Sequence, residues 1–175
     1  MTLRALTLWP EWAWAICHLD KRIENRSWSP TRVGLKAGDW FAIHAGKYIG
    51  GRRGRPATIG GLAAVGEMAA NAGWRPHLFG RALMCTRLGA APSSEDPTLI
   101  PTFCPSSAVV AVVRLGSYGP GLALDTSGWA VPGSCRWHLN EVCVLPRPVP
   151  CGGHQGLWTM PPDVLAAVSA QWSPS

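Results

Sequence analysis

KRIENRSW, at residues 21–28, is the stretch that decides how this chain is interpreted. If it forms a strand, Glu24, Arg26 and Trp28 share one face, while Ile23 and Asn25 share the other. A carboxylate, a guanidinium and an indole on one surface can accept from a base edge, hold a phosphate and stack on a ring. The alternative is a Glu24–Arg26 ion pair on a solvated strand beside a core tryptophan, and residue types alone favour both equally.

Short strands and an early helix are predicted around this stretch. Pro10 suits the first turn of a helix that ends near Asp20. The apolar run at 108–115 predicts a buried strand, and the alternate prolines at 146, 148 and 150 predict a stiff extended crossing. The remaining strands are expected at residues 3–8, 22–28, 40–45, 137–145 and 156–158, and a last short helix is expected from Pro161.

Strands and helices do not alternate along the chain, so the predicted fold is α+β and mainly β, a small β-barrel with flanking helices. With 175 residues, a single domain spanning 1–175 is expected. Residues 48–107 contain glycine-, alanine- and proline-rich stretches in place of strand patterns. They are predicted to be a helical and loop insertion, which includes a mobile basic loop at 50–56. Residues 161–175 form the expected C-terminal helix and tail.

Charge and composition restrict the partners. The net charge of +6 favours an anionic partner without singling out nucleic acid. No signal-peptide pattern and no apolar run of about 18 residues is found, so a cytoplasmic protein that does not enter the membrane is expected.

The six cysteines include no Cys-x-x-Cys pair, so reduced thiols are expected. The sequence has no phosphate-loop motif or dinucleotide fingerprint, and no cofactor is predicted. Two Cys-x-x-His pairs, Cys135/His138 and Cys151/His154, formally suffice for a tetrahedral zinc site. In a strand, however, Cys135 and His138 would face opposite ways, so core or surface roles are favoured and no metal is predicted.

Several segments resemble the ASCH domain family, which belongs to the PUA-like superfold. The matching segments at the N-terminal end are residues 6–16, 21–28 and 43–47. Residues 137–142, 148–151 and 155–158 resemble the ends of small stand-alone members, which are often encoded by phages or prophages. The similarity covers residues 3–47 and 108–160 and leaves the middle unmatched.

The resemblance implies a β-barrel with a cleft beside the first helix, the expected place for RNA or a modified nucleoside. Asp20 stands where the family pattern usually has glycine. Some small relatives are amidohydrolases of N4-acylated cytidines, in which the lysine matching Lys21 works with a threonine. Glu24 occupies that threonine position here, so the resemblance does not carry this chemistry over intact.

Lys21 and Glu24 allow two kinds of function. A lysine in a partly dry site can act as a base or nucleophile, with Glu24 positioning it or shuttling a proton. A neighbouring carboxylate instead stabilises the ammonium form, which favours binding over reaction. The prediction is therefore a module that binds RNA, single-stranded nucleic acid or a modified nucleoside.

The alternatives are a hydrolase of N4-acylated cytidines or RNA phosphodiesters, and a phage-encoded module that interacts with a protein partner. If the protein is an enzyme, Lys21 and Glu24 are the predicted catalytic residues. Trp9, Trp40 and Trp158 are predicted to be core. The predicted ligand-binding residues are Lys21, Glu24, Arg26, Trp28, Trp12, His44, Lys47 and Trp137.

Overall fold

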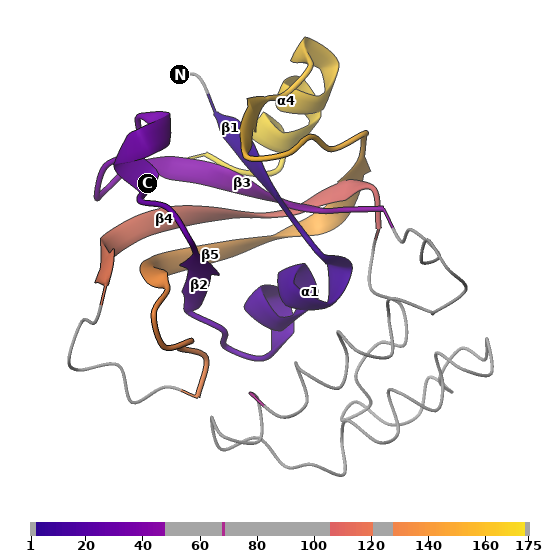
Figure 1. Ribbon diagram of the computed structural model, residues 1–175. Helices are drawn as coiled ribbons and strands as arrows, with labels where there is room; N and C mark the ends of the chain where they lie inside the picture. The colour runs from indigo at the N-terminus through magenta and orange to yellow at the C-terminus, as the bar shows by residue number, and fades with distance from the viewer. Residues whose placement is uncertain (1–2, 48–67, 69–105, 121–127, 174–175) are drawn as a thin grey trace, which may run out of the picture.

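The computed structural model describes residues 3–47, 68, 106–120 and 128–173 (Figure 1). Most of the predicted insertion at 48–107, including the basic loop at 50–56, lies outside these residues.

The described part of the chain contains one mixed sheet with the strand order β2-β5-β4-β3-β1-β6. β1 and β3 are parallel, and the other neighbouring pairs are antiparallel. The strands are β1 (Arg4–Leu8), β2 (Ile23–Arg26), β3 (Trp40–Ala45), β4 (Ala108–Pro120), β5 (Cys135–Pro150) and β6 (Leu157–Thr159). The helices are α1 (Pro10–His18), the short 3₁₀ helix η1 (Pro30–Val33) and α4 (Pro162–Ser169). The predicted mainly β, α+β fold is confirmed.

The two faces of the sheet bury separate cores, with α1 on one face and α4 on the other (Figure 1). β3 shows the alternation that period two predicts: Phe41 and Ile43 face the α1 side, whereas Ala42 faces the α4 side. Ile16 of α1 packs in the first core and Val168 of α4 in the second. A residue's position along a strand therefore decides which core it joins.

The sheet curves into a half-barrel around the α1 core. β2 is at one edge, and β1 is next to the opposite edge. The Nη2 atom of Arg26, at the end of β2, nevertheless donates to the carbonyl oxygen of Thr7 in β1 at 3.3 Å. Arg26 thus joins the two sides of the half-barrel and is held where they meet.

β5 is longer than predicted because it includes the expected proline crossing. β2 pairs only with Cys135–His138 of β5, so the later part of this strand is an edge within the described residues. An edge strand tolerates proline, which has no N–H to donate. The register irregularity opposite Val109–Ala111 also accommodates the prolines, and pairing resumes at Val149.

The length of β5 also separates the two Cys-x-x-His pairs. Cys135 and His138 lie at its beginning, whereas Cys151 and His154 follow its end. In the part of the chain that the structure describes, no group of three His, Cys, Asp or Glu side chains could hold a metal ion. The same part contains no helix long and apolar enough to cross a membrane.

Candidate functional site

The chain reaches the site through a left-handed residue at the end of α1. Asp20 has a φ of 52°, and the next residue, Lys21, donates its backbone N–H to the carbonyl of Ala15 at 3.2 Å. Glycine adopts this left-handed conformation without a steric cost. Asp adopts it at some steric cost and is tolerated because its short polar side chain can hydrogen-bond locally. Asp20 also forms an ion pair with Arg22, with 2.8 Å between Oδ1 and Nη2.

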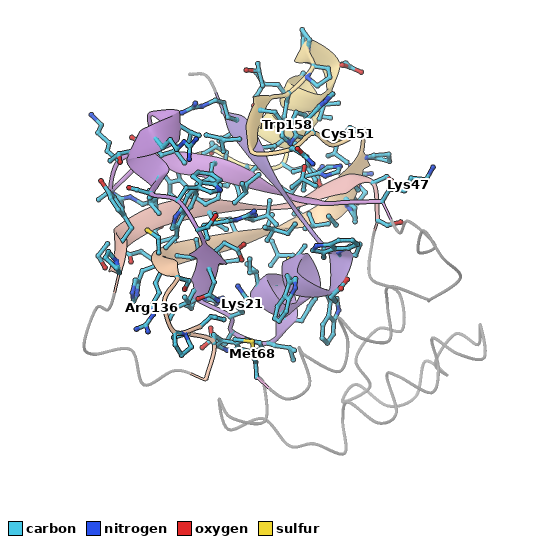
Figure 2. All side chains as sticks on the ribbon, viewed as in Figure 1. Lys21, Lys47, Met68, Arg136, Cys151 and Trp158 are labelled. Atoms are coloured by element: carbon cyan, nitrogen blue, oxygen red, sulfur yellow. The ribbon has the colours of Figure 1, made fainter. Side chains whose placement is uncertain are left out.

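Lys21 is almost completely buried and uses its ammonium group inside the protein (Figure 2). Its Nζ atom donates to the carbonyl of Ile23 and to Oε2 of Glu24, the latter at 2.9 Å. The same atom lies 5.7 Å from the centroid of the Trp12 ring. Lysine is rarely buried to this degree without such partners, so the contacts explain its position.

Glu24 lies between two cations. While Oε2 contacts Lys21, Oε1 lies 3.0 Å from Nε of Arg26. The Arg26 Nε–H does not point well at this oxygen, so the contact is an ion pair without a directed hydrogen bond. We call Lys21, Glu24 and Arg26 the charged cluster; its formal charge is +1, because one carboxylate serves two cations.

The members of the charged cluster differ in access to solvent. The side chains of Lys21, Glu24 and Arg26 are 2%, 9% and 22% exposed, respectively. Arg26 therefore reaches the surface, and its Cζ atom lies 5.9 Å from the centroid of the Trp28 ring. β2 ends at Arg26, so Trp28 lies two residues beyond the strand. Trp28 is itself partly exposed. A guanidinium and an indole are thus available together at the surface.

Trp137 supports Trp28 from the core. Their ring centroids are 4.8 Å apart with nearly perpendicular planes, and the Trp137 indole N–H donates to the Trp28 carbonyl at 3.2 Å. Trp137 is completely buried, which leaves it no surface for the predicted contact with a ligand. Its placement opposite Glu24 in the β2–β5 register makes it part of the wall behind the charged cluster.

The structure separates His44 and Lys47 from the charged cluster. His44 is completely buried and contacts Trp158 in the α4 core, edge to face with 5.5 Å between ring centroids. Lys47 is exposed just beyond the end of β3, well away from Lys21 (Figure 2). His44 and Lys47 are therefore separate from the rest of the predicted set. The structure brings together the other six predicted residues: Lys21, Glu24, Arg26, Trp28, Trp12 and Trp137.

A directed chain of hydrogen bonds fixes the tautomer of His44. The Trp158 indole N–H donates to Oγ1 of Thr7 at 2.9 Å, and Nε2 of His44 lies 3.1 Å from the carbonyl of Cys151. A carbonyl only accepts, so Nε2 carries the hydrogen. The Thr7 hydroxyl then donates to Nδ1 of neutral His44, at 3.3 Å.

Burial of the ring lowers the pKa of His44 below its ordinary value, although the Cys151 carbonyl opposes the shift; His154 lowers the pKa further. With neutral His44, the Trp158 indole N–H, the Thr7 hydroxyl and both ring nitrogens of His44 each have a hydrogen-bond partner. These observations support a structural role for His44.

Two features were missed from the sequence. Trp9 is predicted to be core but is 52% exposed at the N-cap of α1, immediately before Pro10. The Trp-Pro junction before a helix was the available signal. Glu11 is buried in the first turn of α1, where burial raises the pKa of its carboxyl and its own backbone N–H partly opposes the shift. No sequence pattern indicated that burial.

No protein-family model matches the chain, and no curated protein matches it. Among solved structures, the chain is similar to an ASCH protein from Zymomonas mobilis, with a TM-score of 0.49 and 12% sequence identity. The likeness covers 97% of this chain and 94% of that one. Membership of the ASCH family remains a prediction, since likeness at this level does not establish it.

Proposed function

We propose that the protein binds a nucleotide, or an exposed base of RNA or DNA, where Arg26 and Trp28 reach the surface. The observation that carries this proposal is the Arg26–Trp28 pair above a buried carboxylate that is shared by two cations. A guanidinium can hold a phosphate or a base edge, and an indole stacks on any base. The net charge of +6 also favours the approach of an anionic ligand.

In this proposal, Lys21 and Glu24 position the binding residues. Both oxygens of Glu24 already face cations, and little of its side chain is exposed. Glu24 therefore fixes Arg26. The sequence instead suggests that this carboxylate accepts from a base amine. Trp12 lies against the Lys21 ammonium and is partly exposed, which places a second indole beside the same site.

The test is fluorescence anisotropy with labelled single-stranded RNA and DNA over a range of salt concentrations. Arg26→Ala should weaken binding and reduce the salt slope by about 0.7 for each phosphate that the arginine neutralises in the wild type. Trp28→Leu should weaken binding by about 1–3 kcal/mol, because the base can no longer stack on an indole. Arg114→Ala is the matched control, because Arg114 is an exposed, ion-paired arginine on β4. Absence of wild-type binding at low salt, or binding unchanged in both variants, would contradict the proposal.

A hydrolase is the second candidate, favoured by one observation: Lys21 is buried in direct contact with a carboxylate. Such a pair could transfer a proton to a substrate that entered beside it. The opposing observation is that the Lys21 Nζ atom already contacts the Ile23 carbonyl and Glu24, and its side chain is only 2% exposed. Incubation with N4-acylated cytidines and short RNAs, followed by mass spectrometry, distinguishes the candidates. Turnover of either substrate by the wild type would place the enzyme first, and absence of turnover would leave the binding module.

A further inference from the structure

Trp9 is an exposed indole at the start of α1. The large hydrophobic side chains exposed in the described residues are Trp9, Val131 and Val144, so Trp9 is the aromatic one. Isolated exposed aliphatic residues are normal on a soluble protein, but an exposed aromatic ring offers a stacking surface. The position of Trp9 in the fold indicates what could use that surface.

Trp9 and the exposed Lys47 arise from neighbouring strand ends. In the parallel pair of β1 and β3, Leu8 is in register with Ala45, and the N–H of Gly46 donates to the Leu8 carbonyl at 2.8 Å. The backbones are close, since a Cβ on Gly46 would lie 3.0 Å from that carbonyl oxygen. Trp9 follows Leu8 and Lys47 follows Gly46. An indole and an ammonium therefore come from the same end of the parallel β1–β3 pair.

Residues on both sides of Trp9 in the sequence contact members of the charged cluster. The Thr7 carbonyl, two residues before Trp9, accepts from Arg26. Trp12, one helical turn after Trp9 on α1, lies against the Lys21 ammonium. α1 begins where β1 ends (Figure 1), and its Trp14 and Ala15 pack in one cluster with Ile23 of β2. The segment that carries Trp9 therefore contacts the charged cluster on both sides of Trp9, through Thr7 before it and Trp12 after it.

We infer that Trp9 and Lys47 form a second contact for one single-stranded nucleic acid, with a base stacked on Trp9 and a phosphate on Lys47. This inference rests on the proposed function and specifies its ligand as a strand of several nucleotides rather than a free nucleoside. Arg26 and Trp28 place a cation beside an indole at the surface, and Trp9 and Lys47 bring another exposed indole and ammonium to neighbouring strand ends. Repeated aromatic and cationic contacts are typical of binding to single strands, because each base has a face that can stack.

The experiment compares an eight-nucleotide oligouridine with uridine 5′-monophosphate as ligands of the full chain. Trp9→Ser removes the indole and supplies a good N-cap for α1, which has no side-chain cap, so folding should be preserved. Trp9→Ser should weaken oligouridine binding about 5- to 150-fold and leave binding of the mononucleotide unchanged. Trp9→Phe should restore most of the affinity. Lys47→Ala should reduce the salt slope for oligouridine by about 0.7.

The controls are Val144→Ser for an exposed hydrophobic residue and Arg32→Ala for an exposed cation on η1, and neither should change binding. If Trp9→Ser leaves oligouridine binding intact while Arg26→Ala weakens it, the inference is wrong and the proposed function stands. Equal losses of affinity for the mononucleotide and the oligonucleotide would also overturn the second contact. If the wild type binds neither ligand, the proposed function fails and the inference fails with it.

Discussion

Replacing Glu24 by glutamine should strongly destabilise the fold, because Glu24 is the only carboxylate that contacts Lys21 and Arg26 within the described residues. The amide is nearly isosteric, so packing is preserved while the negative charge is removed. One amide position would present N–H groups to a cation 2.9–3.0 Å away, where two donors face each other. Removing one partner of a buried ion pair costs about 3–5 kcal/mol, and Glu24→Gln should lower the free energy of unfolding by this amount.

The assay is urea denaturation followed by far-ultraviolet circular dichroism. The matched control is Glu141→Gln, which breaks the Arg114–Glu141 pair of the same 2.9 Å length. Those side chains are 46% and 43% exposed, so the control should lose less than about 1 kcal/mol. Equal, small losses of stability in the two variants would refute the reasoning, since they would show that the charged cluster is as solvated as the surface pair.

Three further predictions concern residues around the two cores. The lowered pKa of His44 means that the unfolded chain binds its proton more readily, so stability should be complete above about pH 6.5 and fall below it; His44→Gln should reduce this slope in denaturation experiments across pH. Asp20→Ala should be less stable than Asp20→Gly by about 1–2 kcal/mol in urea denaturation, because φ is 52° there, and equal stability would argue against a left-handed residue. Gly153→Ala should lower the melting temperature, because the added methyl would collide with the His44 ring and lie 2.8 Å from the Thr7 hydroxyl; overpacking of this kind costs about 1–3 kcal/mol.

Local periodicity was sufficient to predict much of the sheet. The period of two at 40–45 predicted the two faces of β3, and the spacing of Glu24 and Arg26 predicted their shared face. The Glu24–Arg26 ion pair was one of the two alternatives that the spacing left open. Both inferences depend only on the direction of successive side chains in a strand. For the same reason the start of α1 at Pro10 could be predicted, since proline suits the first turn of a helix.

Contacts that depend on strand order and register could not be predicted in this way. Alternation put His44 on one face of β3, but only the order of the strands shows that this is the face opposite to Lys21. The burial of Trp137 likewise follows from its pairing with Glu24 across β2 and β5. The contact between Lys21 and Glu24 requires the turn at Asp20, whose conformation the sequence did not reveal.

Photocrosslinking tests the central claim most directly, because it identifies the protein residues in contact with the nucleic acid. The protein would be irradiated with a single-stranded RNA containing 4-thiouridine, digested with trypsin and analysed by mass spectrometry. Cleavage after Arg26 and Arg32 releases residues 27–32, the tryptic peptide that contains Trp28. We predict crosslinks on this peptide that disappear in Trp28→Leu. Crosslinks confined to other parts of the protein, and unchanged in that variant, would contradict the account.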